Sequence, residues 1–238
     1  YNAGFSYQGT GDFRNYKWDT YSLLFDGVDE YMNVGDAGLT ASAGTISLWI
    51  KVLDWTAYDN PFDTSSASLS GGIRLEASGG GSPLLRAIYA TDGIGGYGQG
   101  VFVASAVDNQ WAHIVITWSG STIKGYTNGV ESFSATDLYT SFIANVLIIG
   151  AGFWWSSTWR YFNGGIDEVA LWTSALSASE VLAICNGGTP QSLAPYSPTA
   201  WWRMGDLVGG VGGLVTDAVA TDSNALFLPA VAANYASV

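Results

Sequence analysis

The stretch GGIDEVALW, residues 164–172, runs directly into TSALSASEV, residues 173–181, and this pair of segments decides the fold. Two glycines open the first segment, and branched and aromatic residues as far as Trp172 favour a strand buried on at least one face. Asp167 and Glu168 stand inside this apolar pattern. Because burying an unpaired carboxylate is costly, both side chains need partners.

The second segment predicts a short helix. Ser177 is followed three residues later by Glu180, which is the spacing of a capping box, and the Asn-Gly-Gly of residues 186–188 supplies a left-handed stop. A helix of about two turns covers a sheet and does not form a core of its own. Cys185, the only cysteine, is expected to be a small buried residue beneath it.

Other segments have the pattern of strands separated by turns. Residues 45–52 alternate strictly between apolar and polar side chains, with Ile46 and Leu48 expected to face inward. The Asn128-Gly129 pair is suited to a type I′ turn. The remaining predictions are a hairpin of residues 22–25 and 31–34, a loop over 54–70, strands at 73–75, 84–90 and 199–206, a meander over 111–118, 122–127 and 130–134, and a buried strand within 143–155.

Three motifs occur in a characteristic order. They are residues 21–34, which contain FDG at 25–27, then W-x-H-x-x-x-x-W at 111–118 with Y-x-N-G at 126–129, and G-x-I-D-E-V-x-x-W at 164–172. Together they resemble the laminin-G-like, concanavalin-A-like jelly-roll family. The resemblance implies an all-β, two-sheet antiparallel jelly-roll sandwich with one short helix near the C-terminal third, in which the first strand lies beside the strand of residues 166–172.

The predicted organisation is one domain with an extension at each end. Residues 1–20 are read as an N-terminal arm, residues 21–206 as the laminin-G-like domain, and residues 207–238 as an apolar tail that packs on the domain or on neighbours. Residues 1–20 and 223–238 lack the alternation of a self-contained strand pair, so we expect them to make contacts outside the sandwich.

The amino-acid composition argues against several classes of binding partner. The formal net charge is -12, with eight Lys and Arg against twenty Asp and Glu, which argues against nucleic acid or an anionic membrane as the partner. The longest apolar run, within residues 143–155, is too short to span a bilayer. The formal GxGxxG of residues 93–98 is followed by a strand-like segment, so a hairpin tip is preferred over a dinucleotide site.

The resemblance also implies a metal site. In the family, the FDG turn and the I-D-E strand meet at the sandwich rim, often around a calcium ion, and the matching positions are Asp26, Gly27 and Asp167. Because calcium takes six to eight oxygen ligands, other groups would have to complete the shell. The alternative is that Asp26 caps its own turn and Asp167 accepts backbone N–H groups, with no metal.

An aromatic loop provides the candidate ligand site. Trp154, Trp155, Trp159 and Arg160 lie close together in the sequence, and Trp55 follows an earlier strand. Flat aromatic faces beside an arginine suit a rim that stacks on sugar rings or anchors a protein contact. The alternative is that these side chains cover one end of the core.

No catalytic set is recognisable, and we predict that the chain is not an enzyme. His113, the only histidine, has no companion for metal binding or nucleophilic chemistry and is expected to be structural. The stretch at residues 165–170 lacks the spaced carboxylates with which glycosidases of this fold cleave sugars.

The predicted role is a non-catalytic structural or adhesion module. The segment P-x-x-W-W-R-M-G-D, residues 198–206, resembles the ends of such domains in virion proteins of marine bacteriophages, which implies a capsid decoration, fibre or attachment protein. We expect its partners to be protein subunits in a homo-oligomer or larger assembly, together with surface glycans, at a virion surface or outside the cell. The alternative is a secreted, lectin-like carbohydrate-binding domain.

Overall fold

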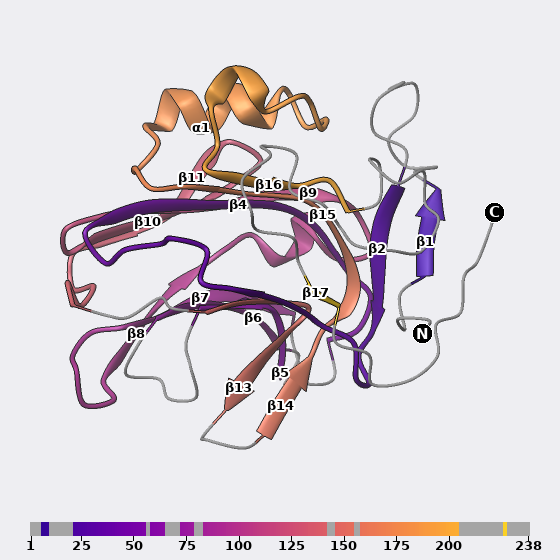
Figure 1. The fold of residues 1–238 in the computed structure, drawn as a ribbon, viewed down its shortest axis with the longest axis horizontal. Helices are drawn as coiled ribbons and strands as arrows, with labels where there is room; N and C mark the ends of the chain where they lie inside the picture. The colour runs from indigo at the N-terminus through magenta and orange to yellow at the C-terminus, as the bar shows by residue number, and fades with distance from the viewer. Residues whose placement is uncertain are drawn as a thin grey trace.

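Two antiparallel β-sheets face each other across a single apolar core (Figure 1). This computed structural model describes residues 6–9, 21–55, 58–64, 72–78, 83–141, 146–154, 158–204 and 226–227. The predicted jelly-roll sandwich is confirmed. One α-helix, α1, is found in those ranges, and it lies over the outer face of one sheet (Figure 1).

Sheet A has the strand order β1-β2-β15-β4-β9-β10-β11, with β16 pairing with β15 as well. Its strands are β1 (Ser6–Gly9), β2 (Tyr21–Asp26), β4 (Ala43–Val52), β9 (Ala112–Ser119), β10 (Thr122–Thr127), β11 (Val130–Ala135), β15 (Asn163–Trp172) and β16 (Ala200–Trp202).

Sheet B has the order β17-β3-β12-β5-β6-β7-β8, and a separate hairpin, β13-β14, lies against β5. Its strands are β3 (Met32–Gly35), β5 (Tyr58–Asp63), β6 (Ile73–Ser78), β7 (Leu84–Ala90), β8 (Tyr97–Val101), β12 (Leu147–Ile149) and β17 (Leu226–Phe227). The remaining elements are β13 (Ala151–Trp154), β14 (Thr158–Tyr161), α1 (Ala178–Cys185) and the 3-10 turns η1 (Ala104–Ala106) and η2 (Ala194–Tyr196).

The stretch at residues 164–172 forms most of β15, the strand that joins the halves of sheet A. Ile166 is opposite Leu23 on β2 and opposite Ile50 on β4, which confirms that the first core strand lies beside β15. The inward side chains of β4 are fully buried, as the alternation predicted. Ser47, expected to point to solvent, is also buried because other side chains and α1 cover the outer face of this sheet.

A bulge in β15 explains how the second carboxylate of the stretch, Glu168, is accommodated. The register with β4 shifts between Asp167 and Ala170, and Glu168 has a positive φ of 47°. This turns the Glu168 side chain toward β16, where its carboxylate accepts hydrogen bonds from Trp201 Nε1 and, at 3.3 Å, from Arg203 Nε. Glu168 therefore has the partners that its burial demands.

The predicted helix is confirmed as α1. Ser177 is its N-cap, the capping box with Glu180 is complete, and Asn186 ends the helix in the left-handed conformation. Val181 and Ile184 pack with Trp172 of β15 in a second apolar cluster, on the outer face of sheet A. Cys185, expected beneath the helix, is instead its last residue; it is buried, and burial raises the pKa of its thiol.

Three local predictions are corrected. β2 and β3 do not form a hairpin, because β2 belongs to sheet A and β3 to sheet B, so residues 27–31 arch between the sheets. The loop expected over 54–70 contains β5, whose Phe62 faces the core. The buried strand within 143–155 is two strands, β12 and β13, broken at Gly150, where φ is 83°.

The other turn predictions are confirmed. Asn128 and Gly129 both have positive φ between β10 and β11, as a type I′ turn requires. The glycine-rich residues 93–98 form the turn before β8 and the start of β8, and Asp92 Oδ1 accepts the backbone N–H groups of Ile94, Gly95 and Gly96. This is a hairpin tip and not a nucleotide loop.

Residues from both ends of the chain pair with the sandwich. β1 pairs with β2 at one edge of sheet A, and β17 pairs with β3 at one edge of sheet B. These two strands extend the sheets. The rest of the arm and tail lies outside the described residues, and the predicted domain boundaries stay a prediction.

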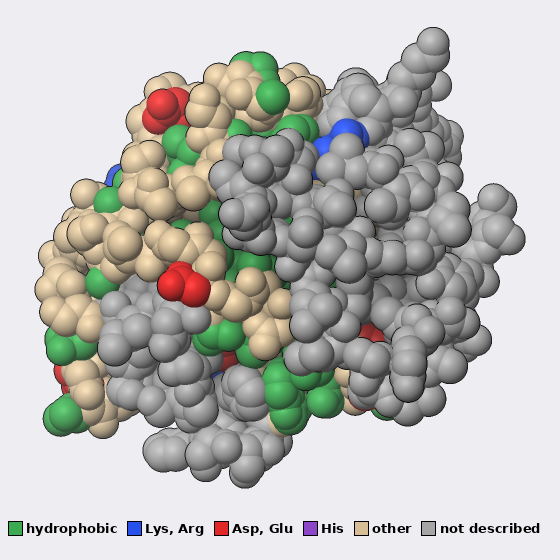
Figure 2. Space-filling model, viewed as in Figure 1, with side chains coloured by type: hydrophobic (Ala, Val, Ile, Leu, Met, Phe, Trp, Pro, Cys, Tyr) green, Lys and Arg blue, Asp and Glu red, His purple; other side chains and the backbone are tan. Residues whose placement is uncertain are grey.

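None of the described helices has the length and apolar character to cross a membrane. Charged side chains are sparse among the described residues on the face in Figure 2.

Candidate functional site

The outer face of sheet B carries a fixed ionic network. In β6, Leu75 and Ala77 face the core, so Glu76 points to the outer face, where it is fully buried. Glu76 Oε2 accepts a hydrogen bond from Arg160 Nη1 at 2.7 Å, and Glu76 Oε1 accepts one from Arg86 Nε at 2.8 Å. One carboxylate therefore holds two guanidinium groups, one from β7 and one from β14.

Beside this network, the face is open to solvent. The guanidinium carbon of Arg160 lies 4.8 Å from the ring centroid of Tyr58, whose side chain is 50% exposed. Arg86 Nη1 donates to the exposed Gln99 Oε1 at 2.6 Å. Together these side chains span the outer face from β5 to β8, a width of three interstrand spacings, or about 14 Å. An aromatic face beside fixed N–H donors suits a ligand that has an apolar ring face and several hydroxyl groups.

The β13-β14 hairpin carries the described part of the predicted aromatic rim. The rings of Trp159 and Tyr161 stack with centroids 5.8 Å apart, and Tyr31 lies 4.6 Å from Trp159. Because side chains alternate along a strand, Arg160 points to the other side of the hairpin, toward Glu76. Although Trp159 and Arg160 are adjacent in the sequence, their side chains lie on opposite faces of the β13-β14 hairpin.

The structure does not show the other candidates of the aromatic rim in contact with Trp159 or Arg160. Trp55 packs against the core, and its Nε1 donates to Asp108 Oδ1 at 2.9 Å. Trp154 ends β13 opposite Thr158, and its side chain lies outside what the structure describes, as does the whole of Trp155. The aromatic rim therefore stays a prediction.

Sequence reasoning missed most of the sheet B network. The sequence predicts a loop at Tyr58 and gives no role to Glu76, Arg86 or Gln99. A signal is present in IRLEAS, residues 73–78, where charged residues alternate with apolar residues, a pattern typical of a strand with one buried face.

Two carboxyl groups with raised pKa lie near the arch between the sheets. Burial raises the pKa of Asp59 to about 7, against the lowering effect of the Asn163 backbone N–H, which donates to it at 3.3 Å. Burial likewise raises the pKa of Glu30 to about 7, and Glu30 Oε2 accepts the backbone N–H of Asp26 at 2.9 Å. In both groups, the folded state binds a proton at a pH where the unfolded chain does not.

The structure does not bring the predicted calcium ligands together. Asp26 is opposite Asn163, whereas Asp167 lies four residues further along β15, or about 13 Å away at strand spacing. Asp26 is exposed and its Oδ1 accepts the Val28 N–H at 2.8 Å, as in the alternative without metal. Calcium–oxygen distances of about 2.3–2.6 Å do not allow one ion to bridge Asp26, Gly27 and Asp167.

The donor set carried over from the family does not fit this chain. Among the residues that the structure describes, no group of three or more His, Cys, Asp or Glu side chains is arranged to hold a metal ion. That the chain binds one structural calcium ion stays a prediction, and comparison of the melting temperature with calcium and with a chelator tests it.

His113 occupies a closed structural position on sheet A. Its Nε2 lies 2.7 Å from Ser47 Oγ, its ring stacks on Trp49 at 5.1 Å, and it is 1% exposed. Burial lowers the pKa of His113 from 6.5 to about 3, so the ring is neutral in the folded protein. A serine and histidine this deeply buried have no access to a substrate, which agrees with the structural role expected from the sequence.

This buried ring predicts a loss of stability in acid. Between pH 6.5 and 3 the unfolded chain protonates His113 and the folded chain does not, so the free energy of unfolding falls by up to about 1.4 kcal/mol per pH unit from this group. His113→Gln is expected to lack that contribution in denaturant titrations at pH 7, 5 and 4. An unchanged dependence on pH in the variant would contradict the assignment.

Comparison with known proteins agrees with the described geometry. The sequence profile of the Concanavalin A-like lectin/glucanases superfamily matches residues 26–182. No curated protein matches the chain. Among solved structures, the chain is similar to domain 4 of AbnA, an extracellular GH43 arabinanase from Geobacillus stearothermophilus, in complex with arabinotriose (TM-score 0.55, 18% identity, 77% of this chain and 86% of that chain covered).

Two further structures show the same likeness. One is a putative carbohydrate binding protein from Bacteroides ovatus (TM-score 0.58, 19% identity, 85% of this chain and 56% of that chain covered). The other is a heptameric SAP-like pentraxin from Limulus polyphemus (TM-score 0.52, 14% identity, 71% of this chain and 83% of that chain covered). At these identities the likeness is one of fold. Since the profile covers most of the chain and the strands form the expected sandwich, the chain belongs to the concanavalin A-like lectin/glucanases superfamily, with a laminin-G-like sequence.

Proposed function

We propose that this chain is a non-catalytic carbohydrate-binding module that uses the outer face of sheet B. The observation that carries the proposal is the Glu76 carboxylate, which holds Arg86 and Arg160 between the exposed Tyr58 and Gln99. Support comes from the similar arabinanase domain, whose structure contains arabinotriose, and from the similar carbohydrate binding protein.

The face suits a neutral sugar. The ring of Tyr58 offers an apolar surface to the C–H groups of a pyranose or furanose, and Arg86 and Gln99 offer N–H donors to its hydroxyl groups. Glu76 offsets one of the two guanidinium charges, so the preference for a neutral sugar rests on the Tyr58 ring and on the hydrogen-bond donors beside it. Because the network is already ordered by its own hydrogen bonds, little side-chain entropy is lost when ligand binds.

The same network argues against glycoside cleavage. A glycosidase needs one carboxyl group free to donate a proton and a second free to attack or to activate water. On this face, both oxygens of Glu76 accept hydrogen bonds from arginines, and the buried Asp63 pairs with Arg74 at 3.9 Å. Carboxylates held by guanidinium groups are poor proton donors.

A bacteriophage virion is our proposal for where the module works. It rests on the resemblance of residues 198–206 to virion proteins, and an attachment protein would combine assembly with glycan binding in one chain. Mass spectrometry of purified phage particles tests this location. Regular copies of the chain in the particle support it, and consistent absence of the chain from particles contradicts it, leaving the secreted lectin.

The binding function is tested with the chain of residues 1–238 on a glycan array, followed by calorimetry with arabinotriose and the strongest array glycans. We expect selective binding to neutral glycans, with no release of reducing ends during prolonged incubation. A folded protein, verified by circular dichroism, that binds no glycan contradicts the proposal. Release of reducing ends contradicts its non-catalytic part.

A further inference from the structure

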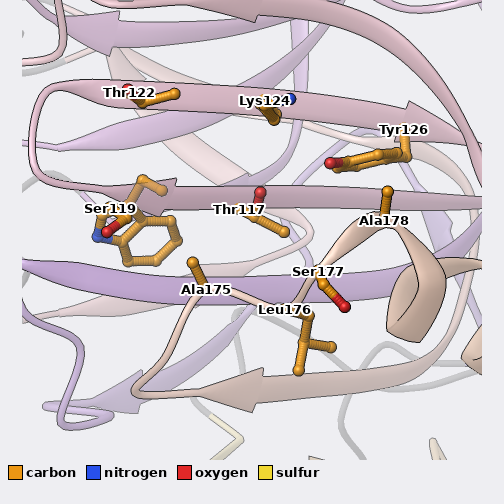
Figure 3. Close-up of a pocket in the computed structure, with 10 residues that line it drawn as sticks. Thr117, Ser119, Thr122, Lys124, Tyr126, Ala175, Leu176, Ser177 and Ala178 are labelled. Atoms are coloured by element: carbon orange, nitrogen blue, oxygen red, sulfur yellow. The ribbon is translucent and has the colours of Figure 1, made fainter.

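A shallow groove lies on the opposite side of the molecule, on the outer face of sheet A. Its floor is formed by β9 and β10, and its wall by residues 175–178, which precede and begin α1 (Figure 3). The groove has a volume of about 240 Å³. The wall is fixed because Thr45 Oγ1 donates to the Ser174 carbonyl at 2.8 Å and accepts the Leu176 N–H at 2.9 Å.

Two residues that are nearly buried present their hydroxyl groups to this groove. Thr117 is 4% exposed and Tyr126 is 2% exposed, and neither hydroxyl has a hydrogen-bond partner among the described residues. In Figure 3 the Tyr126 hydroxyl points along the sheet toward Thr117 and Lys124. Both hydroxyl oxygens open into the groove, where a bound ligand can accept hydrogen bonds from them and donate to them.

The lining selects the chemistry of that partner. Each hydroxyl can donate and accept, which matches a ligand whose own groups are hydroxyls. Lys124 is already paired with Glu131 at 2.8 Å, so the groove offers no uncompensated charge to an anion. Leu176 adds an apolar wall for C–H groups, and the volume is below the usual range for drug-sized ligands, which favours a single ring.

We infer that the groove is a second saccharide site, which takes one neutral monosaccharide unit between Thr117, Tyr126 and Leu176. The inference rests on the proposed function for its ligand class but on different residues, on the other sheet. A module with a site on each sheet can engage two chains of a polysaccharide or two arms of one glycan. Such bivalent binding raises avidity without new contacts.

The test is a site-resolved NMR titration of the chain of residues 1–238 with glucose, galactose, mannose, xylose and arabinose, each at millimolar concentrations. For at least one sugar, we expect amide shifts in β9, β10 and residues 175–178 that saturate. Thr117→Val and Tyr126→Phe remove one hydroxyl each with almost no change in shape. Each is expected to weaken binding in the groove about fivefold.

Tyr139→Phe is the matched control, because Tyr139 packs against the core outside the groove. It should leave the groove affinity unchanged. Shifts confined to the outer face of sheet B would overturn the second site and leave the proposed function intact. Absence of shifts on both sheets would overturn both. Groove shifts that persist equally in the Thr117 and Tyr126 variants would also overturn the inference.

Discussion

Replacing Glu76 with glutamine is expected to lower the free energy of unfolding by about 3 to 5 kcal/mol, a range typical of broken buried ion pairs. The variant keeps the size of the side chain but leaves Arg86 and Arg160, which are 20% and 15% exposed, without the carboxylate between them. For a chain of this length the melting temperature should fall by about 10 °C. Denaturant and thermal unfolding, monitored by tryptophan fluorescence, provide the measurement.

Glu131→Gln is the matched control for this prediction. Glu131 pairs with Lys124 at the surface, where the two side chains are 42% and 38% exposed, and exposed ion pairs contribute about 0 to 1 kcal/mol. Equal losses in the two variants would show that the buried position of Glu76 has no special importance. The organisation of the sheet B face would then need another explanation.

Replacing Glu168 with alanine is expected to cost about 3 kcal/mol, because two hydrogen bonds to a buried charged group are lost together. Trp201 Nε1 and Arg203 Nε both lose this carboxylate, and β16 loses its side-chain link to the bulge of β15. The positive φ at residue 168 remains, so no strain is relieved. Hydrogen exchange should show faster opening of β16 than of β4.

Glu168→Gln separates charge from hydrogen bonding. Its amide oxygen can still accept from Trp201, so it should be less destabilising than Glu168→Ala. If the alanine variant unfolds within about 0.5 kcal/mol of the natural chain, the carboxylate does not hold the late strand, and the account of this stretch is incorrect.

Elements with local signals were predictable from sequence. The capping box at Ser177 and Glu180 defines the start of α1 within four residues, and the Asn128-Gly129 turn needs only its own backbone. β4 was predictable because its inward and outward positions alternate along the whole strand. In each case the deciding chemistry lies within a few positions along the chain.

Elements decided by distant partners were not predictable in this way. The segments around Asp26 alternate in the same way whether they form a hairpin or an arch, and only their long-range pairing assigns them to two sheets. β5 was missed because Pro61 and a polar neighbour, Asn60, occupy its bulge. Here tertiary pairing outweighs local propensity.

The candidate site shows the same limit. Arg160 and Glu76 are 84 positions apart, and Glu76 meets Arg86 only because β6 pairs with β7. No regular spacing in the sequence predicts that these residues will be in contact. The predicted calcium ligands Asp26 and Asp167 are separated for a related reason. The motifs predict that β2 pairs with β15, but they do not predict at which position along the two strands each carboxylate lies.

The most direct test of the proposed glycan face is the dissociation constant of arabinotriose, or of the strongest array glycan, for surface variants of sheet B. Tyr58→Leu and Gln99→Ala remove exposed groups and should each weaken binding about tenfold while leaving the melting temperature unchanged. Gln110→Ala, an exposed glutamine that donates to the Ser105 carbonyl away from this face, should bind like the natural chain. Equal affinity in all three variants and the natural chain would contradict the assignment of the binding face.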